Sequence, residues 1–223
     1  MKKIETRHFN VNYSEKDEYI VEQISKLIDD TYENIIHSFD LSGDVEKFEF
    51  ILCPDVTTFI EKTGKTAEQY QEWMVGNADY IQRKVCILSP NAVTDRSFEE
   101  MLAVIKHEVI HVAFDQLQNA DEADIMIAEG IAVALAEQID VQFINDKEYP
   151  DVRKLSEEEY FYENDGYLFS GVYILHLLRR CGNEKFKKIY AGEESIETYL
   201  YEGFEIDAIR ELFSATNLLT DNH

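Results

Sequence analysis

The chain has 223 residues and a formal net charge of −24 at pH 7, with 45% hydrophobic and 30% charged residues. These proportions are typical of a globular protein that is long enough for one sizeable domain or two closely packed lobes. Its excess of acidic groups repels phosphates, which argues against nucleic acid and anionic membrane surfaces as partners.

The first part of the chain is expected to form an α+β lobe over residues 1–95, with a small mixed sheet and a long helix. Phe9, Val11 and Tyr13 alternate with polar residues, as on a strand with one buried face. Ser14 is expected to cap the long helix, whose apolar residues recur at helical spacing through Phe39. The further predicted elements are a strand at 47–53, helices at 55–63 and 66–74, a turn or irregular strand at 75–78, and a strand at 84–88.

The second part, residues 96–223, is expected to form a mostly helical lobe that joins the first in one compact unit. Its first helix covers 97–117, because Ser97 and Glu100 form a capping-box pattern and no Gly or Pro interrupts the run. A polar connection at 118–121 leads to a second helix at about 122–139. The later predicted elements are a weakly patterned stretch at 141–166, of a length often found in lids or binding segments, helices at 167–180 and 183–190, and two short helices at the end of the chain.

The most informative stretch of the sequence is His107-Glu108-Val109-Ile110-His111, inside the predicted helix 97–117. Residues four apart lie on one face of a helix, so His107 and His111 can bind one metal ion together. Glu108 lies about 100° further round the helix, so it is expected near such an ion but not as one of its ligands. A short motif of this kind also arises by chance, and the two histidines could be core or surface groups. The apolar setting favours a zinc-hydrolase site.

A catalytic zinc site needs a third protein ligand, and Glu129 is the residue that the sequence suggests. It lies among small and apolar residues of the second predicted helix, where a buried carboxylate is normally paired or bound to a metal. The small residues around it would allow close approach to the motif helix. Glu129 could instead form a salt bridge with Lys106 or an arginine. Asp115 is a rival ligand, or a group that orients an imidazole.

With these residues in view, the chain resembles the gluzincin metallopeptidases of the peptidase MA-like group. Their pattern is His-Glu-x-x-His followed, on the next helix, by Glu-Gly-x-Ala, which is found here at residues 107–111 and 129–132. The resemblance extends over nearly the whole chain and implies a zincin-like fold. Three features depart from it: 125–127 lacks a tryptophan common in the family, Val133 stands where some members have aspartate, and 75–78 only faintly echoes the aminopeptidase signature.

The resemblance implies a peptidase that binds Zn2+ through His107, His111 and Glu129, with Glu108 as general base. Tyr167 is similar to the family tyrosine that donates a hydrogen bond to the oxyanion. Tyr173 could serve instead, or both tyrosines could belong to the core. His176 is either a second donor of this kind or a hydrogen-bonded core histidine, and the second interpretation is favoured.

The expected substrate is a peptide or protein, cleaved by an endopeptidase or processing enzyme. The resemblance implies that the substrate adds itself as a strand to 84–88 or 76–80, with 141–166 lining the other wall. The alternative is a catalytically inactive protein of the same fold that binds metal or peptide. A purely structural zinc is the weakest hypothesis, because such sites usually have four protein ligands and favour cysteine.

The remaining expectations concern the cellular compartment. The first residues carry two lysines with no apolar stretch behind them, which is unlike a secretory signal, and the run 167–178 is too short to span a bilayer. Cys53, Cys86 and Cys181 have no paired spacing, which predicts buried free thiols in a reducing compartment. We therefore expect a cytoplasmic protein that does not bind membranes; the sequence leaves its oligomeric state open.

Overall fold

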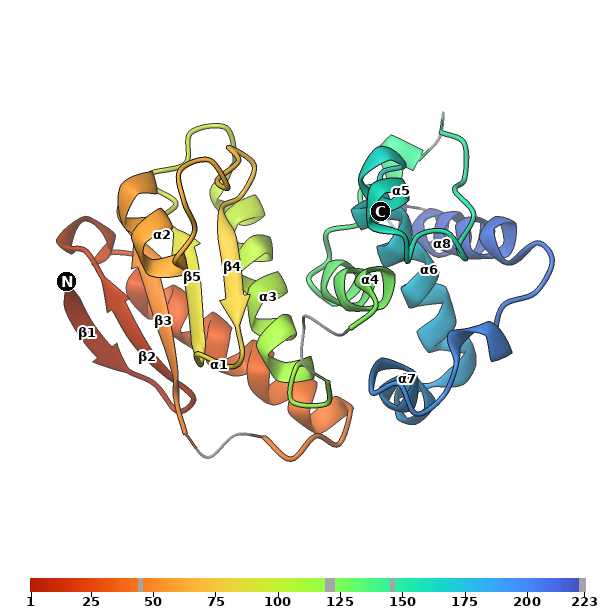
Figure 1. Cartoon of the computed structure of the whole chain (residues 1–223), viewed down its shortest axis with the longest axis horizontal. Helices are drawn as coiled ribbons and strands as arrows, with labels where there is room; N and C mark the ends of the chain where they lie inside the picture. The colour runs from red at the N-terminus through yellow and green to blue at the C-terminus, as the bar shows by residue number, and fades with distance from the viewer. Residues whose placement is uncertain (44–45, 119–122, 145–146, 221–223) are drawn as a thin grey trace. The chain divides into compact units, whose positions relative to one another are not determined.

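The computed structural model of the chain describes residues 1–43, 46–118, 123–144 and 147–220, without the side chains of 216–220. Within these ranges the chain forms five strands, eight α-helices and three short 3-10 helices, which are labelled η (Figure 1). The elements, in chain order, are β1 (Lys2–Glu5), β2 (Phe9–Tyr13), η1 (Glu15–Asp17), α1 (Val21–Ser38), β3 (Phe48–Cys53), α2 (Val56–Thr63), β4 (Gly76–Asp79), β5 (Lys84–Leu88), α3 (Phe98–Phe114), α4 (Ile125–Leu135), η2 (Val141–Ile144), α5 (Glu158–Glu163), α6 (Gly166–Cys181), α7 (Asn183–Tyr190), η3 (Ile196–Thr198) and α8 (Phe204–Thr220).

The chain forms two compact units, Met1–Ala120 and Asp121–His223. All five strands belong to the first unit, and the described part of the second unit contains only helices and loops. The predicted combination of a small mixed sheet and a helical second half is confirmed. The expected lobes met between residues 95 and 96, whereas the observed division places α3 with the first unit.

The sheet of the first unit has the strand order β1-β2-β3-β5-β4. The two inner pairs, β2 with β3 and β3 with β5, are parallel, and the hairpin partners β1 and β4 are antiparallel to their neighbours. Helices α1 and α3 cover one face of the sheet and α2 lies on the other (Figure 1). This order makes β4 an edge strand that lies beside α3.

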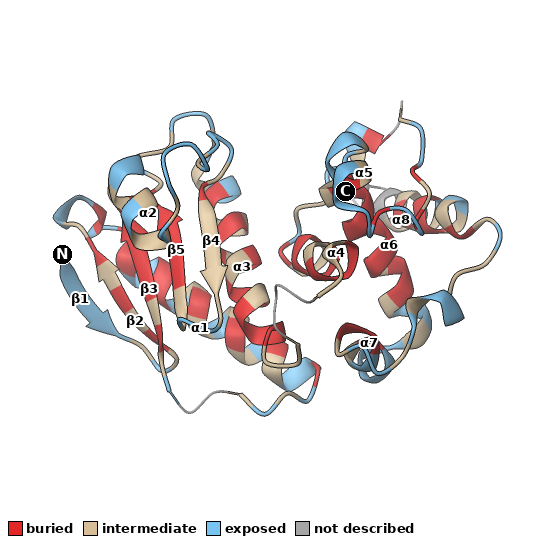
Figure 2. Cartoon of the chain, viewed as in Figure 1, coloured by how far each residue is buried: buried red, intermediate tan, exposed pale blue. Residues whose placement is uncertain are grey.

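Aromatic side chains form the core of the first unit. Phe9, Phe48 and Phe50 alternate with less buried residues along β2 and β3 and are fully buried (Figure 2). Tyr32 of α1 packs on this cluster, with its ring centroid 5.9 Å from those of both Phe9 and Phe48. The alternation that predicted the first strand therefore reflects burial against α1.

Helix α6 contributes many buried residues to the second unit, and its core residues Phe169 and Tyr173 are almost inaccessible to solvent. Tyr173 and Phe204 of α8 pack edge to face, with their ring centroids 6.0 Å apart.

The motif helix α3 and the other described helices are either too short or too polar to cross a membrane.

Two of the predicted helices are wrong in position or kind. The long helix begins at Val21 rather than after Ser14, because Ser14 donates a hydrogen bond to the buried carboxylate of Asp17 at 2.6 Å in the short helix η1. Ser89 and Asn91, after β5, also donate to Asp17 and anchor this turn to the sheet. Residues 66–74 form turns instead of a helix. There Thr66 and Gln69 form a capping-box pair, in which each side chain accepts the other's N–H, but the turn that it starts does not continue as a helix.

Other boundaries differ less. Residues 76–79 are a regular strand, and α4 ends at Leu135, short of the expected 139. The stretch 141–166 contains η2 and α5, and the last helix, α8, is long rather than short. The connection at 118–121 lies almost entirely outside the described residues. Strand β1 was not predicted, because all four of its residues are exposed and it carries no burial alternation.

The cysteines are free, as predicted, but only two of them are buried. Cys53 and Cys86 lie inside the sheet, whereas Cys181 at the end of α6 is half-buried. Hydrogen bonding with Cys86, followed by burial, raises the pKa of Cys53, and the same hydrogen bond lowers the pKa of Cys86. The two buried thiols are therefore neighbours across β3 and β5.

Candidate metal centre

Helix α3 carries the His-Glu-x-x-His motif and begins with the predicted capping box. The Ser97 hydroxyl accepts the Glu100 N–H at 3.1 Å, and the Glu100 carboxylate accepts the Ser97 N–H at 2.6 Å. From this start the helix continues without interruption to Phe114. Its buried apolar residues fix it on the sheet, so the motif histidines project from a rigid element.

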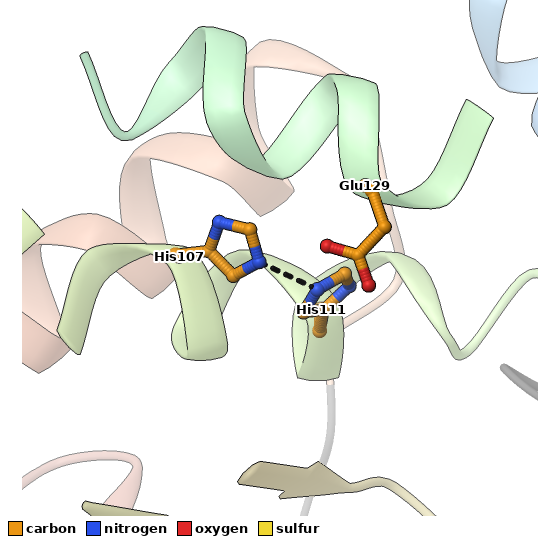
Figure 3. Close-up of side chains that lie close together, drawn as sticks. All are labelled: His107, His111 and Glu129. Atoms are coloured by element: carbon orange, nitrogen blue, oxygen red, sulfur yellow. Dashed lines mark hydrogen bonds between the residues drawn. The ribbon is translucent and has the colours of Figure 1, made fainter. Parts of the chain in front are cut away.

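The two motif histidines converge as the helical spacing predicted. The Nε2 atoms of His107 and His111 lie 3.0 Å apart (Figure 3), and their ring centroids are 4.7 Å apart. Two nitrogen ligands of a tetrahedral zinc ion lie about 3.3 Å from each other, as follows from Zn–N bonds of about 2.0–2.1 Å. The spacing of the two imidazoles therefore suits one metal ion bound by both.

Glu129 lies on α4, which is built for close packing against α6. The helix starts at Asp124, whose carboxylate accepts the N–H groups of Met126 and Ile127. A Cβ on Gly130 would lie only 2.8 Å from the backbone oxygen of Ser170. The small residues of α4 were expected to allow close approach to the motif helix. One of them, Gly130, is required by the packing of α4 against α6.

Val133, a departure from the family pattern, also belongs to this packing. It is 4% exposed, and a Cβ on Gly171 of α6 would lie 2.4 Å from its Cγ1. An aspartate at this position would bury a carboxylate among apolar atoms, which is unfavourable without a partner. The valine thus fits the helix packing of the second unit.

Among the described residues, His107, His111 and Glu129 form a group that could hold a metal ion. One ligand atom from each lies within 4.8 Å of the others, and Figure 3 shows the Glu129 carboxylate beside the facing imidazoles. Two imidazoles and one carboxylate are the protein donors of a catalytic zinc site that keeps a position open for water or substrate. The rival ligand Asp115 is buried at the end of α3 and is not part of this group.

Glu108, the predicted general base, follows His107 on α3 and is half-buried. Its side chain lies directly against Gly76 of the edge strand β4. Sequence analysis did not predict that Gly76 lies against Glu108. A glycine inside a strand pattern can mark the close approach of another group, and Gly76 is such a glycine.

Tyr167, the predicted oxyanion donor, lies in the first turn of α6 and is half-buried. Its ring packs edge to face on Phe161, with the centroids 5.1 Å apart. Burial raises the pKa of the neighbouring Tyr162, a hydrogen bond from Tyr167 works against this shift, and the charge of Glu129 reinforces it. Tyr162 is thus an electrostatic neighbour of the ligand carboxylate and a hydrogen-bond partner of Tyr167, and no sequence pattern had indicated Tyr162.

The two other residues considered as oxyanion donors are held in the core of the second unit. Tyr173 is fully buried and donates its hydroxyl to the backbone oxygen of Pro150 at 2.9 Å. His176 is 5% exposed; its Nδ1 pairs with the Glu211 carboxylate and its Nε2 lies 3.2 Å from the Tyr201 hydroxyl. The interpretation of His176 as a hydrogen-bonded core histidine agrees with these contacts.

Comparison of the chain with protein-family models, with curated proteins and with solved structures finds no match. The residues of the site and their geometry are therefore the basis on which its chemistry is argued.

Proposed function

We propose that the chain is a zinc-dependent metallopeptidase of the gluzincin type with a zincin-like fold. The observation that carries this proposal is the convergence of one donor atom each from His107, His111 and Glu129. Two neutral imidazoles and one carboxylate suit Zn2+, and a set of only three protein ligands is typical of catalytic rather than structural zinc. Zinc in such a site acts as a Lewis acid and lowers the pKa of its water to about 7.

We assign the proton transfers of this reaction to Glu108. It follows the ligand His107 on α3, and its side chain lies against Gly76 of β4. We infer that it accepts a proton from the water that attacks the peptide carbonyl, and then gives that proton to the leaving amine. Tyr167, which hydrogen-bonds with Tyr162 near Glu129, would donate a hydrogen bond to the oxyanion as negative charge develops.

The edge strand β4 supports a peptide as the substrate. The Leu88 N–H donates to the Val75 oxygen at 2.8 Å, so these two residues form a hydrogen-bonded antiparallel pair. Pairs alternate along an antiparallel ladder, which turns the N–H and C=O of Gly76 and Ala78 away from β5 and toward the free edge. An extended peptide could add itself there as a strand. Its scissile bond would then pass close to Glu108.

A second candidate is a protein of this fold that binds metal or peptide without turnover. Val133 favours it, because this buried valine offers no hydrogen bond where some gluzincins have an aspartate that holds a histidine. If the second candidate binds metal, the two share the same site and differ only in catalysis.

Metal analysis and a base variant test the proposal. Protein purified without chelator and supplied with zinc should bind about one ion per chain. His107→Ala and Glu129→Ala should each weaken zinc binding. The Glu108→Gln variant should keep the ion and lose at least about a hundredfold in cleavage of a peptide library, as general bases contribute about 10²–10⁴. Glu99→Gln, an exposed site on the same helix, is the matched control and should cleave normally.

The outcomes separate the two candidates. Zinc binding with no cleavage by the unaltered chain would favour the binding protein. Undiminished cleavage by the Glu108→Gln variant would remove Glu108 from the mechanism. An unaltered chain that binds no zinc would refute the peptidase and leave only a protein that binds peptide without metal.

A further inference from the structure

We propose that Gly76 is a positioning residue for Glu108: its missing side chain leaves the space in which the catalytic carboxylate is held. This inference rests on the proposed peptidase function. A Cβ built on Gly76 would lie 2.5 Å from Oε1, 2.8 Å from Cγ and 2.9 Å from Cδ of Glu108. All three separations are shorter than carbon atoms tolerate, so no other amino acid at position 76 is compatible with this placement of the carboxylate.

The glycine is required for space rather than for backbone conformation. Gly76 is not among the glycines with a positive φ, and it pairs regularly with Ile87 in the β4–β5 ladder. Glycine weakens a strand, because it loses more conformational freedom on folding and has no side chain to pack. Its presence at this position of a four-residue edge strand is explained by the close approach of α3.

The same glycine brings the base close to the substrate's expected path. The backbone N–H and C=O of Gly76 point to the free edge, where the peptide would lie. A side chain at 76 would push Glu108 away from this strand and from the line along which a scissile carbonyl would run. Gly76 would therefore set the distance between the base and the bound peptide without contacting the reacting atoms.

The physical consequence of adding a methyl group here is unusual. The atoms that it meets belong to the end of a flexible side chain, which can rotate away at little cost in stability. A shift of the carboxylate by about 1 Å is enough to lower a rate by about a hundredfold. The effect of Gly76→Ala should thus appear in turnover and not in folding.

The test compares Gly76→Ala with the unaltered chain, both full-length and loaded with zinc, on one cleaved peptide. The variant should lose at least about tenfold in kcat, because the base is displaced, while KM stays within about twofold. Zinc content and Tm should be unchanged. Ala67→Ser, which adds one heavy atom at an exposed turn of the same unit, is the control and should leave kcat within about twofold.

A second variant and a crystal structure complete the test. In a Glu108→Gln background, Gly76→Ala should cause no further loss of the residual rate, because the two residues act through one carboxylate. A crystal structure of zinc-loaded Gly76→Ala should show the Glu108 carboxylate moved off β4.

An unchanged kcat in Gly76→Ala, the same fractional loss in the Glu108→Gln background, or an undisplaced carboxylate would each overturn the inference. If the unaltered chain cleaves no peptide, the proposed function fails and the effect on turnover falls with it. The crystal structure then still decides separately whether Gly76 sets the position of Glu108.

Discussion

The two tyrosines of α6 that were considered as oxyanion donors, Tyr167 as the prediction and Tyr173 as its alternative, occupy different environments in the structure. Burial is the main factor that raises the pKa of Tyr173, whose hydroxyl is committed to the Pro150 carbonyl. Tyr167 lies half-buried in the first turn and hydrogen-bonds with Tyr162. Tyr167 is therefore the tyrosine that we propose as the oxyanion donor.

Substitution by phenylalanine should therefore impair turnover at Tyr167 and stability at Tyr173. Tyr167→Phe should lower kcat about a hundredfold, as loss of one oxyanion donor typically does, and leave the free energy of unfolding unchanged. Tyr173→Phe should leave kcat unchanged and lower the free energy of unfolding by about 1 kcal/mol, since the Pro150 oxygen loses its donor. Steady-state kinetics and urea unfolding measure the two effects. Equal losses of turnover in both variants would contradict this assignment.

At the scale of elements, the start of α3 determines how firmly the motif histidines are held. The Ser97–Glu100 capping box satisfies N–H groups at the first turn, and the rest of the helix then follows without a break to His107 and His111. A weakened cap would fray this end of the helix before it affected the ligands.

Ser97→Ala should lower the free energy of unfolding by about 1 kcal/mol through loss of the N-cap bond. Ser156→Ala, at an exposed turn, is the control and should change it by less than about 0.5 kcal/mol. Urea unfolding of both variants is the measurement. A Ser97→Ala protein as stable as the control would show that the cap contributes nothing.

The capping box also predicts a dependence on pH. Hydrogen bonds from the backbone and side chain of Ser97 lower the pKa of Glu100. A carboxyl group with a lowered folded pKa stabilises the fold fully above its unfolded pKa, about 4.3, and loses this contribution as the pH falls through the folded value. The stability difference between the unaltered chain and Glu100→Gln, which removes the titrating carboxyl group, should therefore shrink below about pH 4.

At the scale of the whole molecule, metal binding should be coupled to folding. A ligand that binds only the folded chain stabilises it by about 4.1 kcal/mol at a free concentration of 1,000 times Kd. Zinc should accordingly raise Tm, and a chelator should reverse the rise. Glu108→Gln should keep the increase, whereas His107→Ala and Glu129→Ala should each lose most of it. An increase that survives in both ligand variants would place the zinc elsewhere.

The sequence was informative wherever the signal was local. Three local features were predicted, because caps and periodicity act over a few residues: the capping box and unbroken apolar run of α3, the position of α2 and the Asn183–Tyr190 helix. Predictions were wrong at Ser14, whose hydroxyl pairs with Asp17, and at 66–74, where a local cap starts a turn that does not continue as a helix. Strand β1 carried no signal, since it is exposed on both faces.

The site shows the same difference between what local patterns predict and what long-range packing decides. The sequence by itself determined that His107 and His111 share one side of a helix, because the geometry of the α-helix fixes residues four apart. It also suggested Glu129, because a carboxylate among apolar residues requires a partner. Only the tertiary structure decided that Gly76 accommodates Glu108, that α6 requires Gly130, and that Tyr173 belongs to the core. These contacts join segments far apart in the chain, and side-chain packing rather than any local pattern brings such segments together.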